Sequence, residues 1–451
     1  MTTSTQSLEQ IAYRVAIVLP HSKEIMAESD GDSLRLPTVT IQRWDRIAEQ
    51  ITANVKARWS LQTVVVDSAP STDGSPCVAI LEFLSCGVNG GHTMRPCHLD
   101  EISIDTKHRE LLQEFLGEKG GIRSPLLQLG WIDQAKRWLQ ANIRDREIQF
   151  DGDIRQLNSG AGFALIRLGA LVGPAYWIKA AGAPNRHEVA ITETLSECSP
   201  SFLPPLVAVH RTWNAWAMEE VGTALTDVTD VRTISLVSLN LARLQQQTTS
   251  HGKSLLDCGC GDQRTKTLRG YLPAFIDGVD KLAVSTTLEN PVNDIAAILA
   301  QLETTLRAAL DEIRDLRIPN TINNNDMKLA NILFDGRRCV FTDWCHAHWG
   351  NPFLTFQHLQ TYLARRLPDL ATPFQNAYSE AWTTFLSEVQ IQRMLTLAPV
   401  VAPYAYICGR GTESLASRVS DPGFRKLYLR IVERIMVAGD HLNGKEGRTY
   451  V

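Results

Sequence analysis

The pattern of apolar and polar positions divides the chain into two stretches of different character. Up to about residue 148, short apolar runs surround one long segment, Ile41–Arg58, whose apolar residues recur at helical spacing. The remaining candidates in this stretch are strands at Tyr13–Pro20, Leu61–Val66 and Cys77–Leu84 and a closing helix at Trp131–Ile143. This order predicts a separate small α/β domain at residues 1–148.

After the charged junction Arg144–Gly152, closely spaced strands are followed by helices. The predicted elements are strands at Ile154–Leu157, Phe163–Leu168, Tyr176–Ala181, Leu206–Val209 and Ala215–Glu219, and a helix at Arg186–Glu197. From Val231 onward the periodicity is helical, except for a strand–loop–strand stretch at Thr321–Thr342. The pattern predicts an α+β protein in which a small β-rich lobe, about 149–222, precedes a large helical lobe, about 223–451.

The first stretch resembles the Nudix fold in its order of a strand, a long helix and further strands, with LPTV before the helix. The Nudix signature places several glutamates on that helix, because they hold magnesium on a diphosphate. Here the comparable residues Arg46–Ile51 offer the single carboxylate of Glu49. The resemblance implies a domain that has lost this chemistry and serves for binding or scaffolding, so we expect any protein partner to dock on it.

One segment of the second stretch carries a pattern typical of phosphoryl transfer. Asp326 is followed five residues later by Asn331, and then by an apolar run, a turn at Asp335-Gly336 and a second strand that ends at Asp343. A hairpin at this turn would bring the ends of the two strands together. Phosphoryl transfer uses a carboxylate that accepts the proton of the substrate hydroxyl, and oxygen ligands that hold magnesium on the nucleotide phosphates. The spacing predicts that these residues share one site.

This segment resembles the catalytic loop of aminoglycoside phosphotransferases and related kinases for choline, homoserine, fructosamine and methylthioribose. Their motif reads HGDxxxxN followed by a strand and IDW, and this chain reads NNDMKLAN followed by FTDW. The resemblance extends over roughly residues 150–440 and implies a bilobal, protein-kinase-like fold. It also implies an ATP- and magnesium-dependent kinase for a small hydroxylated molecule, with Asp326 as catalytic base and Asn331 and Asp343 as magnesium ligands.

Two lysines fit the same resemblance. Lys179 stands alone in the β-prone YWIKAA, where an unpaired lysine costs free energy. The family's matching lysine contacts the nucleotide phosphates and pairs with a glutamate on the next helix, for which Glu188 is the best match and Glu193 the alternative. Lys328, two residues after Asp326, is expected to neutralise the transferred phosphate; a solvated loop lysine is the alternative.

Two further stretches are expected to contact the nucleotide. NSGAG lies where the family has its nucleotide-covering loop, and small residues such as Ser159 and Gly160 let backbone amides approach phosphates, although an ordinary hairpin turn would use the same residues. WAMEEVG resembles the hinge between the lobes, with the adenine held by backbone groups around Glu219 and Val221. Because backbone groups read the base there, GTP in place of ATP is left open.

The segment departs from the family motif at Asn324, which stands where the family has a histidine that braces the loop. Asparagine can also donate and accept hydrogen bonds. The retained base, metal ligands and Lys179 favour an active enzyme. The alternative is a catalytically inactive pseudokinase that binds a nucleotide and acts as a partner-binding module.

Composition and charge limit the classes of partner that we expect for this chain. With 44% apolar and 21% charged residues the chain has the mix of a globular protein, and its formal net charge of −4 gives no case for nucleic acid. The polar start MTTSTQSLEQ is not a secretory signal, and no apolar run reaches the roughly 18 residues that cross a bilayer. We therefore expect a cytoplasmic protein without a membrane partner, whose nine scattered cysteines are ordinary thiols.

The charge of the helical lobe bears on the acceptor. Residues 361–440 contain seven Asp and Glu against nine Lys and Arg. An enzyme acting on a polycationic aminoglycoside would need carboxylates in this part of the lobe. The count therefore favours a neutral or anionic hydroxylated acceptor.

Overall fold

The computed structural model describes residues 10–42, 46–69, 76–86, 94–117, 126, 128–143, 147–160, 163–228, 230–286, 295–409 and 421–444. The chain forms two compact units: unit 1 is Met1–Val189 with Pro205–Glu220, and unit 2 is Ala190–Pro204 with Val221–Val451. Both contain helices and strands, so the fold is a mixed α+β fold, as predicted. No helix in the described part of the chain has the length and apolar character that crossing a membrane requires.

Unit 1 begins with a mixed sheet in the order β3-β2-β1-β6-β5, with β4 paired to β1 and β7 to β2. Its elements are β1 (Gln10–Val18), β2 (Ile25–Asp30), β3 (Ser33–Arg35), β4 (Thr38–Gln42), α1 (Ile47–Trp59), β5 (Leu61–Ala69), β6 (Cys77–Cys86), β7 (Met94–Cys97) and α2 (Thr106–Leu116). Val15 and Ile17 of β1 join the core that contains α1, whereas Ala16 and Val18 join the core that contains α2. Because β1 is buried on both faces, it is a continuous apolar run in the sequence.

The helix predicted at Ile41–Arg58 begins too early. Thr38–Gln42 is strand β4, in which Ile41 is buried and pairs with Ile11 of β1. Helix α1 begins at Ile47, and Trp44 lies outside the described residues. The alternation in TVTIQ fits a strand, and pairing with β1 decides between the two periods.

A second, antiparallel sheet of unit 1 has the order β11-β12-β10-β9-β8. Its elements are β8 (Phe150–Asn158), β9 (Phe163–Ala170), β10 (Tyr176–Ala181), β11 (Leu206–His210) and β12 (Ala215–Glu219), with α3 (Trp131–Asn142) before it. Helix α4 (Glu188–Cys198) follows β10; its first two residues belong to unit 1 and the rest to unit 2. Helix α3, predicted to close the first domain, packs on this second sheet, where Leu139 shares a core with Ile166 and Ile178. Both sheets belong to unit 1, so a domain boundary at 148/149 stays a prediction.

A buried glutamine links the two sheets of unit 1. The Gln156 side chain on β8 accepts a hydrogen bond from the Val65 main-chain N–H at 2.7 Å and donates one to the Val65 carbonyl at 2.8 Å. The side-chain amide thereby satisfies both main-chain groups of Val65, as the backbone of a neighbouring strand would. Since both partners are buried, these bonds fix β8 against β5.

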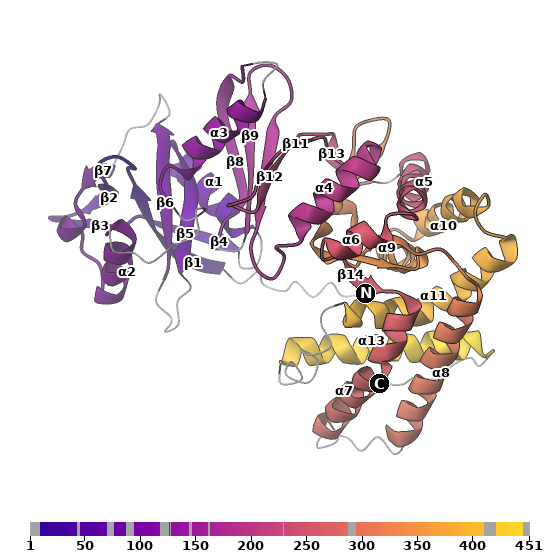
Figure 1. Ribbon diagram of the computed structural model, residues 1–451. Helices are drawn as coiled ribbons and strands as arrows, with labels where there is room; N and C mark the ends of the chain where they lie inside the picture. The colour runs from indigo at the N-terminus through magenta and orange to yellow at the C-terminus, as the bar shows by residue number, and fades with distance from the viewer. Residues whose placement is uncertain are drawn as a thin grey trace. The chain divides into compact units, whose positions relative to one another are not determined.

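Unit 2 is mainly helical, with α7 and α8 side by side (Figure 1). Its helices are α5 (Val231–Thr248), α6 (Gly252–Asp257), α7 (Thr265–Thr286), α8 (Ile295–Asp315), α9 (Phe353–Arg366), α10 (Pro368–Trp382), α11 (Glu388–Cys408) and α13 (Pro422–Leu442). Two small sheets, β13-β16-β17 and β14-β18-β15, contain β13 (Thr223–Ala224), β14 (Gly261–Gln263), β15 (Thr321–Asn324), β16 (Ile332–Phe334), β17 (Cys339–Phe341) and β18 (Ala347–Gly350). The predicted strand–loop–strand stretch is β15 to β17, whereas β13, β14 and β18 were not predicted.

Candidate functional site

The hairpin predicted after Asn331 is present in unit 2. Strands β16 and β17 are antiparallel, and the Asp335 carboxylate closes their turn by accepting two main-chain N–H groups. At the open end of the hairpin, the Thr342 N–H donates to the Asn331 carbonyl at 2.9 Å. Asp343, the next residue, is thereby brought beside Asn331.

Three of the predicted site residues meet at this point. The Asn331 Nδ2 lies 3.0 Å from the Asp326 carbonyl oxygen and 3.5 Å from the Asp343 Oδ2. The amide nitrogen of Asn331 therefore faces protein acceptors, which turns its Oδ1 in the opposite direction. An amide oxygen and a carboxylate are both ligands that magnesium accepts.

Asn324 joins the two ends of this loop. Its Nδ2 donates to the Asp343 carbonyl at 2.7 Å, and its Oδ1 accepts the Asp326 main-chain N–H at 2.8 Å. The side chain is fully buried, so both hydrogen bonds are shielded from water. Asn324 thus donates one hydrogen bond and accepts one, and so holds the two ends of the loop together, as expected for this position.

Sequence reasoning missed Thr355, which fixes Asn324 in turn. The Thr355 Oγ1 on α9 accepts the Asn324 N–H at 2.8 Å and donates to the Asn324 carbonyl at 3.3 Å. The two residues are 31 positions apart. No local pattern signals this contact, because it depends on how α9 packs against β15.

The remaining contacts of the loop concern charge and backbone conformation. Lys328 Nζ lies 3.1 Å from Asp326 Oδ2, and both side chains are partly exposed. Asp343 has a positive φ of 65°, a left-handed conformation that costs most residues roughly 1–2 kcal/mol and that aspartate tolerates better than most. The Cys345 Sγ donates to the Asp343 Oδ1 at 3.2 Å, so the carboxylate is held from the side chain as well as through the backbone.

In unit 1, the predicted lysine and its first-choice glutamate form a buried ion pair. The Lys179 Nζ lies 2.5 Å from the Glu188 Oε1, and the two side chains are 7% and 1% exposed. The ammonium group also lies 5.4 Å from the centre of the Phe163 ring and 5.5 Å from that of Trp216. These contacts explain how a lysine is accommodated in an otherwise apolar strand.

The stretch predicted to cover the nucleotide forms the connection between β8 and β9. Ser159 Oγ donates to the Val65 carbonyl at 2.7 Å, and the Gly160 carbonyl accepts the Phe163 N–H at 3.4 Å. Residues 161 and 162 lie outside the described part of the chain. In this structure the Ser159 hydroxyl is thus engaged by the first sheet of unit 1.

The hinge-like stretch follows β12. The main-chain N–H of Glu219 donates to Pro205 and that of Glu220 to Ala175, at 3.0 and 2.8 Å. The Glu220 carboxylate, which was not predicted to matter, accepts two hydrogen bonds from the Arg167 guanidinium, at 2.7 and 2.9 Å, and this holds its pKa below the usual range. Val221 begins the second segment of unit 2, so its role, like that of Glu219, stays a prediction.

No protein-family model and no curated protein matches the chain. Among solved structures it is similar to the choline kinase of Cryptosporidium parvum, with 14% identity, coverage of 69% of this chain and 96% of that chain, and a TM-score of 0.48. The ethanolamine kinase of Plasmodium vivax is 15% identical, with 74% of this chain and 94% of that chain covered and a TM-score of 0.44. The macrolide 2'-phosphotransferase of Brachybacterium faecium is 16% identical, with 70% of this chain and 100% of that chain covered and a TM-score of 0.40. None of these comparisons supports the Nudix resemblance of the first stretch. Over about 70% of its length, the chain is similar to structures of choline and ethanolamine kinases and of aminoglycoside and macrolide phosphotransferases.

Proposed function

We propose that the chain is a magnesium-dependent phosphotransferase that moves the γ-phosphate of ATP or GTP to a hydroxyl of a small molecule. The observation that carries the proposal is the meeting of Asp326, Asn331 and Asp343 on one braced loop. In this proposal residues 149–222 and 223–451 are the two kinase lobes, and residues 1–148 are an additional domain.

Asp326 is the proposed catalytic base. Its main-chain N–H is fixed by Asn324, while its carboxylate, one-third exposed, lies where a bound acceptor can reach it. The base accepts the proton of the acceptor hydroxyl as the phosphoryl group is transferred. Lys328, 3.1 Å from this carboxylate, is the proposed counter-charge to the transferred phosphate.

Asn331 and Asp343 are the proposed magnesium ligands, through the Asn331 Oδ1 and the Asp343 carboxylate. Oxygen donors of this kind fit magnesium, which prefers hard ligands. When bound, the ion offsets the negative charge of the nucleotide phosphates. The chain contributes orientation: Asn331 is held through its Nδ2, and Asp343 through its carbonyl and its Oδ1.

Lys179 is the proposed contact to the nucleotide phosphates, positioned by Glu188. A buried carboxylate 2.5 Å from the ammonium nitrogen pairs with the lysine and restricts its rotamers. Ser159 and Gly160 are proposed to approach the phosphates through the backbone, and Glu219 and Val221 to hold the base. These assignments rest on the sequence motif, and the buried ion pair supports the first of them.

The proposed acceptor is a neutral or anionic hydroxylated metabolite, on the basis of the mildly basic composition of residues 361–440. The test is phosphate transfer by the full chain, with magnesium and γ-labelled ATP or GTP, to a panel of hydroxylated metabolites and antibiotics. Transfer to a metabolite supports the proposal. A polycationic aminoglycoside as the best acceptor would refute the acceptor class, and failure to bind either nucleotide would refute the phosphotransferase itself.

A further inference from the structure

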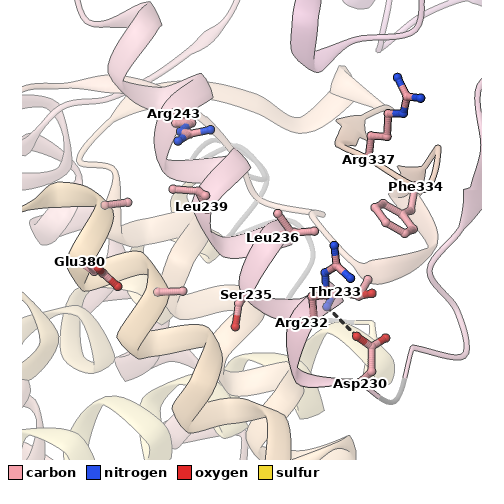
Figure 2. A pocket seen from close by; sticks show the side chains of 13 residues that line it. Asp230, Arg232, Thr233, Ser235, Leu236, Leu239, Arg243, Phe334, Arg337 and Glu380 are labelled. Carbon is pink, nitrogen blue, oxygen red and sulfur yellow. Dashed lines mark hydrogen bonds between the residues drawn. The ribbon is translucent and has the colours of Figure 1, made fainter.

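Unit 2 contains a cavity of about 980 Å³ that none of the proposed catalytic or nucleotide-binding residues lines. One wall is the face of α5 that carries Arg232, Leu236, Leu239 and Arg243, and a second is α10. The third is the β16–β17 hairpin, which contributes Phe334 (Figure 2). The volume is at the upper end of the range of about 300–1,000 Å³ that is usual for ligand sites.

Three arginines line this cavity. Arg232, Arg243 and Arg337 are exposed, and none of them forms a salt bridge with the residues that the structure describes. The lining holds two carboxylates: Asp230, which caps α5 by accepting the Thr233 N–H at 2.7 Å, and Glu380 on α10. The cavity therefore offers more cationic groups than its own carboxylates neutralise.

The charges and the apolar surface are arranged along the groove. Arg232 and Arg243 are eleven residues apart on α5, so their backbone positions are separated by about 16 Å along the helix axis, at a rise of about 1.5 Å per residue. Leu236 and Leu239 lie between them on the same helix face, and both are only half-buried. Figure 2 shows Phe334 and Arg337 on the hairpin, across from the α5 side chains.

This arrangement distinguishes between ligand classes. A single phosphate or the triphosphate of a nucleotide could pair with the arginines, but it would leave the apolar side chains between them uncovered. An extended peptide covers this length with about five residues, at roughly 3.3 Å per residue. Acidic residues at its ends and apolar residues between them would match the groove.

We propose that the groove between α5, α10 and the β16–β17 hairpin docks a peptide segment of a partner protein that has acidic residues at both ends and apolar residues between them. The arginines pair with the acidic residues at the two ends, and Leu236, Leu239 and Phe334 receive the apolar side chains between them. Glu380 on the α10 wall disfavours an acidic residue on that side, which gives the peptide a fixed position.

The groove also touches the proposed catalytic loop. Phe334 and Arg337 belong to the hairpin that connects Asn331 to Asp343. A docked peptide therefore contacts the segment that holds both proposed magnesium ligands. The docking itself does not depend on the proposed phosphotransferase activity and is tested without it.

The experiment selects seven-residue random peptides displayed on phage against the full chain, and measures the affinity of the enriched peptides by fluorescence anisotropy. We expect sequences with acidic residues at both ends and apolar residues between. Arg232→Glu with Arg337→Glu should weaken their binding at least tenfold. The matched control is Lys253→Glu on α6, whose side chain is 92% exposed and does not line the groove.

Three results would overturn the proposal. The selection could enrich no binding peptide, enrich peptides without acidic residues, or enrich peptides that bind the charge-reversed variant as well as the wild type. Inorganic tripolyphosphate provides the remaining comparison. If it binds and the reversal abolishes its binding while no peptide is enriched, the groove is a small-anion site and the peptide proposal is wrong.

Discussion

The side chain of Asn324 makes two hydrogen bonds that connect the main-chain N–H of Asp326 to the main-chain carbonyl of Asp343. It is fully buried and is itself held by Thr355. A residue in this place fixes the positions of the proposed base and of one proposed metal ligand without touching a substrate. We therefore treat Asn324 as a positioning residue.

Replacing Asn324 by alanine should lower kcat about 10- to 100-fold, because it leaves a buried donor and acceptor unpaired, at a cost of about 1–3 kcal/mol. The KM for the nucleotide should change little. Asn324→His should recover part of kcat, since neutral imidazole offers one donor and one acceptor. Steady-state kinetics of the three proteins is the measurement; equal kcat for wild type and Asn324→Ala would contradict the positioning role.

The ion pair of Lys179 and Glu188 gives a prediction on stability. Lys179→Met leaves a buried carboxylate without this cation and should destabilise the protein by about 3–5 kcal/mol. The double variant Lys179→Met, Glu188→Leu should recover most of the loss, because two apolar side chains replace the pair. Thermal unfolding measures both effects.

An exposed pair on α6 serves as the control. Lys253→Met removes a partner of Asp257, and since the two side chains are 92% and 62% exposed it should cost less than about 1 kcal/mol. If Lys179→Met proved as mild as this control, the pair would not be the buried, mutually dependent unit that the structure shows.

At the scale of residues, the proximity of Asp326, Asn331 and Asp343 was predictable from the sequence, because their spacing around a short hairpin is local information. Lys179 and Glu188 are nine residues apart, and the family resemblance implied their pairing, with Glu193 as the alternative. The contact between Asn324 and Thr355 was not, because 31 residues and the start of α9 separate the two. Interactions that depend on packing between distant elements leave no periodic signal.

Strand β6 and helix α3 meet at a buried carboxylate. Glu82 is 2% exposed and accepts the Gly130 N–H at the start of α3 at 2.9 Å. Burial raises the pKa of Glu82 to about 7; the Gly130 N–H lowers it, nearby Asp133 raises it and Lys136 lowers it. The carboxyl group of Glu82 therefore stays protonated to a higher pH in the folded protein than in the unfolded chain.

This shift predicts a pH dependence of stability. Because the folded pKa lies above the unfolded value of about 4.5, the contribution of Glu82 is complete below pH 4.5 and is lost as the pH rises through about 7. The loss is on the order of 3 kcal/mol, since one pKa unit corresponds to about 1.4 kcal/mol. Glu82→Gln should lack this term, so its thermal midpoint relative to wild type should rise from pH 5 to pH 8.

An exposed carboxylate on α8 provides the control for that experiment. Glu303→Gln makes the same change in net charge away from β6. Its thermal midpoint should follow that of the wild type across the same pH range. Parallel curves for wild type and Glu82→Gln would show that the Glu82 carboxylate does not lose stability with rising pH.

Helices and strands with a strong local pattern have bounds close to the predicted ones. Those that depend on pairing with a distant strand were misassigned or not predicted. The strand at Tyr176–Ala181 has the predicted bounds, because both of its faces are apolar except at Lys179. Ile41 was assigned to a helix, although pairing with β1 places it in β4. The short strands β14 and β18 pair across more than 80 residues, which no local window detects.

For the whole molecule, the sequence predicted the α+β class and the change of character after about residue 150. Contacts between elements group the chain differently, since unit 1 joins the first sheet to the sheet that carries Lys179. Gln156 and helix α3 are the physical reasons: one bonds β8 to β5, and the other packs on the second sheet. Neither contact was predictable from the sequence, because Gln156 looks like any polar residue of a strand and α3 like any amphipathic helix.

The most direct test of the phosphotransferase proposal compares wild type with Asp326→Asn. Both should be stabilised against thermal unfolding by magnesium with ATP or GTP, because the substitution leaves Lys179, Asn331 and Asp343 in place. Only the wild type should transfer the γ-phosphate to an acceptor, and the variant should be slower by about 10²- to 10⁴-fold, the usual contribution of a general base. Equal transfer by both proteins, or stabilisation of neither by any nucleotide, would contradict the account.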